Sequence, residues 1–198
     1  MMINILQDVA CSFARCIFAG RPIEREIINL FSSLADRCVL FEIFEKKGQT
    51  FCRLAGGIPP EKHSIGYESR IIEHPDINEV FLRQKTLLII DPVQDSLTNY
   101  FIEIILGADI REIIYLPLEE RGKVVGIVVV DVCDKNIFDE ERMILLEGLR
   151  REICKVLDDK TIFVDTHEGW NLLSTIAPRA THNHSAFQII PPERAVVN

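Results

Sequence analysis

The apolar residues of this chain follow two kinds of pattern, one with the period of a helix and one with the density of a strand. Residues 2–19 and 22–34 carry apolar side chains at steps of three and four, so each range predicts a helix with one apolar stripe. Gly20 lies between these two predicted helices. A third helix is predicted from Phe138 to Val156, because acidic residues at its start precede a further apolar row.

Between these helices lie short runs rich in β-branched and aromatic residues, which predict strands. Residues 38–44 and 50–54 flank a turn and predict one antiparallel hairpin, and residues 113–118 and 124–132 predict another. A compact strand is predicted at residues 86–90, before an Asp-Pro turn. We expect a single sheet to contain Val39, Phe41, Leu87, Ile89, Ile114, Leu116, Val125, Ile127 and Val129. The elements together predict an α+β fold with one mainly antiparallel sheet between layers of helices.

The second half of this pattern resembles a GAF domain. The resemblance rests on the strand Ile113–Leu118, a charged turn with Gly122, the strand Val124–Val130, and an amphipathic helix that Phe138 and acidic residues open. Upstream, Leu87–Asp95 is similar to the strand and aspartate-bearing loop that this family places before its pocket helix. The resemblance covers residues 3–158.

This resemblance implies a sensory fold: a six-stranded antiparallel sheet with the N- and C-terminal helices on one face and a small-molecule pocket on the other. The irregular stretch 58–106, with predicted short helices around Val80 and over residues 97–106, is the candidate lid of that pocket. We expect the pocket to be lined by Tyr67, Phe81, Asp91, Tyr100 and Tyr115. The alternative is that the aromatic side chains only complete the core and that Asp91 caps the Asp-Pro turn.

Composition and charge limit the classes of function. The 198 residues include 30 acidic and 22 basic side chains, and the net charge of −8 argues against nucleic-acid binding. With 47% hydrophobic and 26% charged residues, the chain supports a proper core. Its apolar runs fall short of the ~18 residues of a membrane span, so we expect a soluble, cytoplasmic protein. A change of character near residue 159 predicts a domain at 1–159 and a weakly packed extension at 160–198.

The sequence lacks the strong motifs of catalysis and metal binding. It has no Gly-rich phosphate loop, no Gly-x-Ser-x-Gly and no His-Glu-x-x-His. Its six cysteines form no Cys-x-x-Cys pair, which favours buried reduced thiols over a zinc or redox site. Residues 134–140 depart from the signature of cyclic-nucleotide-binding GAF domains, no bilin motif surrounds a cysteine, and residues 58–110 lack the cysteines of methionine sulfoxide reductases with this fold. We therefore expect a non-catalytic domain, and its cofactor or ligand is not identified by the sequence.

The C-terminal extension contains one further candidate site. The run Ser174–Phe187, in which His182 precedes Asn183, is similar to the phosphoacceptor helix of sensor histidine kinases. In such a helix an exposed ring nitrogen attacks the γ-phosphate of ATP. The similarity implies His182 as a candidate phosphoacceptor and the chain as a remnant of such a kinase. The alternative is a solvated tail in which the histidines are incidental.

The function favoured by these observations is a regulatory, small-molecule-sensing domain of bacterial-type signal transduction, associated with a histidine kinase. Two alternatives remain: a ligand-free dimerisation or interaction module, and a methionine sulfoxide reductase-like enzyme. We also expect a homodimer joined through the first and last helices, because both have more apolar surface than one sheet face covers. In the last helix, Met143, Leu146, Ile153 and Leu157 nearly keep heptad spacing beside a second row at Leu145 and Leu149.

Overall fold

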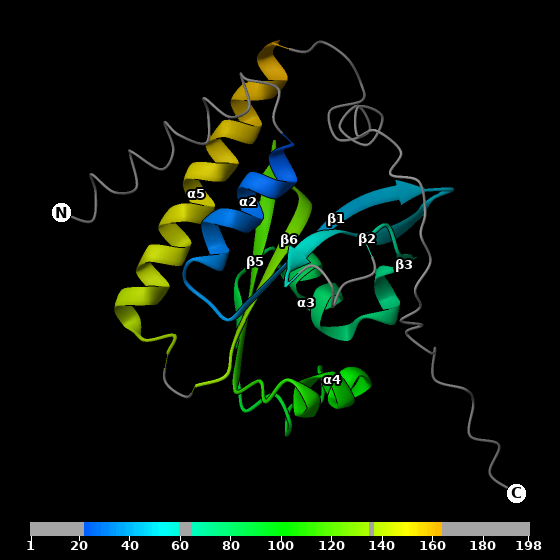
Figure 1. Cartoon of the computed structure of the whole chain (residues 1–198). Coiled ribbons are helices and arrows are strands. Elements are labelled where there is room, and N and C mark those ends of the chain that lie inside the picture. The colour runs from blue at the N-terminus through cyan, green and yellow to red at the C-terminus, as the bar shows by residue number, and fades with distance from the viewer. Residues whose placement is uncertain (1–21, 60–64, 135–136, 164–198) are drawn as a thin grey trace, which may run out of the picture.

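The computed structural model of the chain describes residues 22–59, 65–134 and 137–163 (Figure 1). Their strands form one sheet in the order β3-β2-β1-β6-β5-β4, and every neighbouring pair is antiparallel. The strands are β1 (Arg37–Lys46), β2 (Gln49–Ile58), β3 (Glu68–Arg70), β4 (Leu87–Ile90), β5 (Glu112–Glu120) and β6 (Lys123–Val132). The α-helices are α2 (Ile23–Ser32), α3 (Pro75–Arg83), α4 (Ile102–Gly107) and α5 (Glu140–Phe163), and two 3-10 turns are η2 (Ile71–Glu73) and η3 (Asn99–Phe101).

Two hairpins are closed by two-residue turns that fix the register of their strands. Lys47 and Gly48, between β1 and β2, have φ angles of 55° and 72°, and Arg121 and Gly122, between β5 and β6, have φ angles of 51° and 71°. Two successive residues with positive φ match the twist of paired antiparallel strands. The turns therefore determine which side chains of each hairpin share a face of the sheet.

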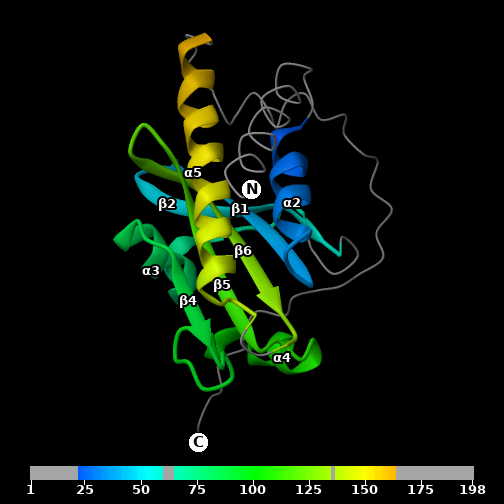
Figure 2. The ribbon, with the colours of Figure 1, turned by 90° about the vertical axis from the view of Figure 1, so that its left-hand side faces the viewer.

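Both faces of the sheet are covered, and each has its own apolar core. In Figure 1, α2 and α5 lie to the left of β5 and β6 while α3 lies to the right, and Figure 2 looks onto α5 and α2. The core under α2 and α5 includes Ile27, Phe31, Leu40, Ile114, Leu116, Val128, Val130, Leu146, Leu149 and Ile153. The core under α3 and α4 includes Val39, Ile43, Cys52, Ile77, Val80, Ile105, Ile113, Tyr115, Ile127 and Val129. Successive residues of the central strands thus enter opposite cores, which explains their continuous apolar runs.

The fold agrees with the sequence in class, sheet and order of elements. The nine residues predicted to share a sheet lie in β1, β4, β5 and β6, and the predicted α+β fold with a six-stranded antiparallel sheet is confirmed. Among the described residues, no helix combines the length and the apolar character that crossing a membrane requires. The helix predicted at 2–19 and the candidate phosphoacceptor His182 lie outside the described residues.

Some elements differ from their predicted form. β3 pairs with Phe51–Arg53 and has no counterpart in the sequence prediction, because its three residues are polar or charged. The helix predicted over residues 97–106 is divided into η3 and α4, since Phe101 has non-helical angles of φ −127° and ψ 28°. α5 continues to Phe163, beyond the predicted end at Val156.

Candidate functional site

A buried carboxylate lies at the centre of a polar network on the α3–α4 face of the sheet. Asp76, in the first turn of α3, exposes only 2% of its surface. Its Oδ2 accepts a hydrogen bond of 2.6 Å from the hydroxyl of Tyr115 in β5, and its Oδ1 accepts one of 2.7 Å from the hydroxyl of Tyr100 in η3. One side chain therefore ties α3 both to the sheet and to the segment that leads into α4.

His74 extends this network toward the edge strand β3. Its Nδ1 lies 3.2 Å from the Tyr100 hydroxyl and its Nε2 lies 2.5 Å from Ser69 Oγ, which is 3.5 Å from Cys52 Sγ. Because the Tyr100 hydrogen is donated to Asp76, Nδ1 donates to Tyr100. In the neutral imidazole, Nε2 then accepts from Ser69. Burial lowers the pKa of His74 and favours that form, although neighbouring carboxylates act in the opposite direction.

Burial and hydrogen bonding oppose each other at the centre of the network. Burial raises the pKa of the Asp76 carboxyl group, and the bonds from Tyr115, Tyr100 and the backbone N–H of Ile77 offset part of that rise. Burial and the neighbouring Asp76 raise the pKa of both tyrosines, so their hydroxyls remain protonated donors at neutral pH. The network therefore consists of matched donors and acceptors in a protein interior.

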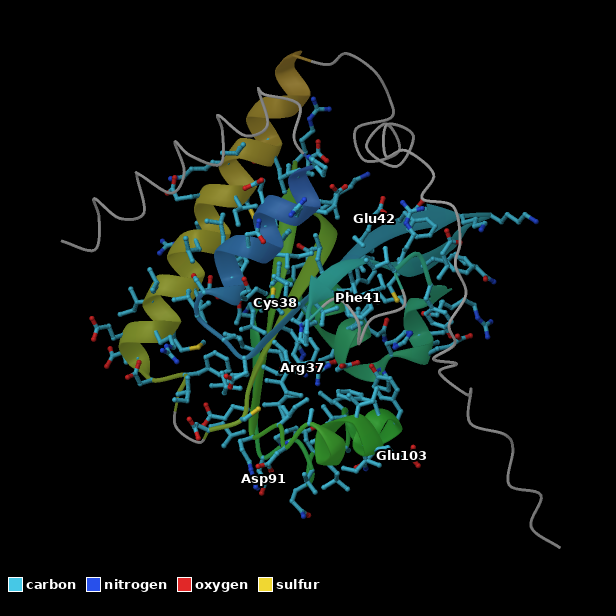
Figure 3. All side chains as sticks on the ribbon, in the orientation of Figure 1. Arg37, Cys38, Phe41, Glu42, Asp91 and Glu103 are labelled. Atoms are coloured by element: carbon cyan, nitrogen blue, oxygen red, sulfur yellow. The ribbon has the colours of Figure 1, made fainter. Side chains whose placement is uncertain are left out.

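A second buried polar feature on the same face is the pair of Arg37 and Asp131. These residues are cross-strand partners in β1 and β6. Each lies two positions from a valine, Val39 or Val129, that belongs to the core under α3, so they share that face of the sheet. Arg37 Nε lies 3.7 Å from Asp131 Oδ1. Burial raises the pKa of Asp131 to about 6, against the opposing effect of Arg37 and with a further rise from Asp36. Figure 3 labels Arg37 beside Cys38, whose side chain belongs to the opposite core.

Metal and thiol chemistry find little support in the described part of the chain. Within residues 22–59, 65–134 and 137–163, His, Cys, Asp and Glu side chains form no group that could hold a metal ion. Cys38, Cys52, Cys133 and Cys154 are free thiols, and the first two are buried as the sequence suggested. Burial raises the pKa of Cys38 to about 12, which keeps it in the unreactive thiol form.

The structure brings together two of the five predicted pocket residues. Tyr100 and Tyr115 share Asp76 as their acceptor, and Phe81 packs partly buried against the same apolar core. Tyr67 precedes β3 and is 45% exposed. Asp91 is exposed after β4 with a φ of 59°, and its carbonyl accepts a hydrogen bond from Gln94 N–H that closes a turn. A common cavity for all five residues stays a prediction.

Sequence reasoning missed the residues that organise this face. The sequence gives no signal for Asp76 or His74, because the role of each depends on tyrosines from distant segments, Tyr100 and Tyr115. Asp131 offered a signal, since it is a charged residue at the end of an otherwise apolar strand. Its partner follows only from the strand register.

Comparison with known proteins relates the chain by structure rather than by sequence. No family profile and no curated protein matches the sequence. The GAF domain of a Coxiella burnetii phosphoenolpyruvate-protein phosphotransferase superimposes with a TM-score of 0.64 at 19% identity, covering 82% of this chain and 95% of that one. The phycocyanobilin-bound GAF domain of a cyanobacterial phytochrome gives a TM-score of 0.60 at 13% identity, covering 82% and 97%.

A third similar structure comes from a signalling kinase. The GAF domain of a Bacillus halodurans two-component sensor histidine kinase gives a TM-score of 0.56 at 15% identity, covering 70% of this chain and 93% of that one. All three likenesses span nearly the whole of the compared domain at low identity. The described part of this chain therefore has the fold of a GAF domain.

Proposed function

We propose that this chain is a regulatory domain that binds a small molecule between the sheet and the α3–α4 layer and passes its bound state to a signalling partner. Structures of the same fold come from a sensor histidine kinase, a phosphotransferase and a phytochrome with a bound bilin, which supports a sensory role. The observation that carries the proposal is the network around Asp76. It joins the sheet to α3 and η3, the elements that a ligand would have to contact.

Asp76 provides a binding group that the lid already occupies. Burying a carboxylate is costly unless its oxygens are hydrogen-bonded, and here two tyrosine hydroxyls provide those bonds. Its Oδ2 is held by Tyr115, which is 1% exposed, whereas its Oδ1 is held by Tyr100, which is 43% exposed. A ligand N–H or O–H group that takes the place of the Tyr100 hydroxyl on Oδ1 would release η3 and α4 from α3.

The same sheet is connected to the helix that leads out of the domain. Glu112 at the start of β5 accepts hydrogen bonds at Oε2 from the backbone N–H groups of Ile137 and Phe138, just before α5. Further along α5, Arg150 binds Glu147 and Glu119 of β5. A displacement of β5 would therefore move α5, which is the route we propose toward a kinase-type output. In that scheme His182 remains the candidate phosphoacceptor.

A thermal-shift screen of the full chain against small metabolites tests the proposal. A ligand that binds only the folded state at about 100 times its Kd should raise Tm by roughly 5–10 °C. Asp76→Asn should abolish the shift, and Tyr100→Phe should retain or increase it because the ligand no longer displaces a hydroxyl. Glu79→Gln, elsewhere on α3, is the matched control and should behave as the unchanged chain. Compounds that raise Tm equally in the unchanged chain and in Asp76→Asn would refute the proposed site.

The second candidate function is a ligand-free interaction module of the same fold. It is favoured by the completeness of the Asp76 network, in which each hydroxyl and each carboxylate oxygen already has a partner. Under this alternative no metabolite shifts Tm, and Asp76→Asn changes only the stability of the domain.

A further inference from the structure

Arg37 and Asp131 leave hydrogen-bonding groups unused in the interior. Their closest charged atoms, Nε and Oδ1, are 3.7 Å apart, which is too far for a hydrogen bond. Arg37 Nε, Arg37 Nη1 and Asp131 Oδ1 are buried without a hydrogen-bond partner, and within the described residues they are the only buried side-chain polar atoms in that condition. Asp131 as a whole is 5% exposed.

The chain builds a complete ion pair elsewhere in the same sheet. Glu42 and Arg53, cross-strand partners in β1 and β2, are also largely removed from water. Arg53 Nε donates a hydrogen bond of 2.9 Å to Glu42 Oε2, and its Nη2 donates a second bond to the same oxygen. A buried pair that lacks such bonds is costly, because desolvation exceeds the attraction between the charges. The open arrangement at Arg37 and Asp131 is therefore not required by the sheet.

We propose that Arg37 and Asp131 hold the polar end of the ligand, and that this end presents a hydrogen-bond acceptor beside a donor, as the carboxylate and ammonium groups of an α-amino acid do. The inference rests on the proposed function and specifies the ligand class of that site. The N–H groups of Arg37 require an acceptor, and Oδ1 of Asp131 requires a donor. The pair has no net charge. A purely anionic group would be repelled by the carboxylate of Asp131, and a purely cationic group would be repelled by the guanidinium of Arg37.

The neighbouring positions fit a ligand with one polar end. Ile113 is the partner of Asp131 in β5, and Val39 and Val129 come next along β1 and β6, so the wall around the pair is apolar. Next along β5 is Tyr115, whose hydroxyl binds Asp76. Asp131 also contributes to raising the pKa of Tyr115, so the two polar features interact electrostatically. The pair therefore lies next to the Asp76 network on the same face of the sheet.

Matched sets of small probes test the ligand class. The thermal shift of the full chain is measured with natural α-amino acids, each beside its carboxylate without the amino group and its amine without the carboxylate. The amides of the same amino acids, in which a neutral group replaces the carboxylate, show whether the ligand must carry a carboxylate or only a hydrogen-bond acceptor beside a donor. We expect a rise of several degrees only with molecules that carry both groups. Equal shifts from the one-group molecules, or no shift with any probe, would overturn the inference.

Variants of the pair separate binding from a structural role. Arg37→Met combined with Asp131→Leu should fold with a Tm equal to or above that of the unchanged chain and should lose the probe-induced shift. Asp131→Asn, a smaller change, should weaken binding of the zwitterion at least tenfold. Glu42→Gln, in the complete pair on the opposite face, is the control and should lower Tm while keeping the shift. A double variant that loses stability and still binds the probes shows a structural pair and refutes the inference.

The outcomes also distinguish this inference from the proposed function. If another metabolite class shifts Tm and the shift depends on Asp76 but not on Arg37, the sensing function stands and the ligand class is wrong. If no compound of the metabolite library shifts Tm, the proposed function itself fails, and the double variant then reports only on stability.

Discussion

At the scale of single residues, Asp131 shows how a strand can retain a charge at a cost to stability. Burial raises its pKa from 3.8 to about 6, so between these values the folded chain binds a proton that the unfolded chain has lost. The contribution of Asp131 to the free energy of unfolding therefore falls as pH rises from about 4 to about 6 and levels off above that range. The ionised side chain thus lowers the stability of the fold at neutral pH, which is consistent with a role in binding.

Asp131→Asn removes this titration. The free energy of unfolding of the variant, relative to that of the unchanged chain, should therefore increase as pH rises from about 4 to about 6, because only the unchanged chain loses stability through this titration. Urea unfolding of both proteins across the acid range gives the difference directly and cancels the contribution of Asp76, whose pKa is also raised. A difference that stays constant with pH would contradict the assignment.

The two tyrosine donors of Asp76 differ in exposure, and this predicts different costs when each is removed. Tyr115→Phe leaves a fully buried carboxylate oxygen without a donor and should cost about 1–3 kcal/mol. Tyr100→Phe should cost clearly less, because Tyr100 is half-exposed and water can replace its hydroxyl. Denaturant unfolding of the two variants ranks them, and a larger loss from Tyr100→Phe would be inconsistent with this network.

At the scale of elements, the contact of α2 with β2 depends on the absence of a side chain at Gly56. A Cβ atom placed there would lie 2.6 Å from Ile28 Cδ1, and Ile28 is itself 5% exposed. Gly56→Ala should therefore force the buried Ile28 side chain to shift and should cost roughly 1 kcal/mol. Gly107→Ala, at the end of α4, meets no atom within 4 Å and should be neutral within error in the same thermal unfolding measurement.

The elements were predictable where local pattern and packing agree. The strands β1, β5 and β6 were evident from dense apolar runs, since both of their faces are buried. β3 was missed because three polar residues at a sheet edge have no period of their own, and pairing with β2 alone makes them a strand. The division of the segment before β5 into η3 and α4 follows from the angles at one residue, Phe101, which no periodicity reveals.

At the scale of the whole molecule, the site is assembled from segments that the sheet order brings together. Arg37 and Asp131 are separated by most of the domain, and only the pairing of the first strand with the last one joins them. Asp76, Tyr100 and Tyr115 likewise come from a helix, a 3-10 turn and a strand. Sequence pattern identified the two tyrosines by their place in the lid and the sheet, but it could not identify the carboxylate between them.

The exposed surface of α5 indicates where the predicted homodimer would form its contact. Leu146, Leu149 and Ile153 all pack against the sheet, so Leu149 belongs to the buried row rather than to the second row expected from the sequence. Among the α5 residues whose side chains the structure describes, up to residue 158, Ile144 is a large apolar residue that is 49% exposed. We therefore expect α5 to contribute to a dimer seam around Ile144, on the side of the helix turned away from the sheet.

Light scattering of the full chain should give twice the chain mass of 22.6 kDa at micromolar concentration, and the protein shortened by residues 160–198 should likewise give twice its own, smaller chain mass. Ile144→Glu places a charge in an apolar seam and should weaken association about tenfold or more, without lowering the stability of the separated chain. Leu82→Glu, an equally drastic change at a 67% exposed residue of α3, is the control and should leave the mass unaltered. Because association stabilises the folded state by mass action, the Tm of the unchanged chain should also rise with protein concentration. A mass of one chain for both the full and the shortened protein excludes the dimer.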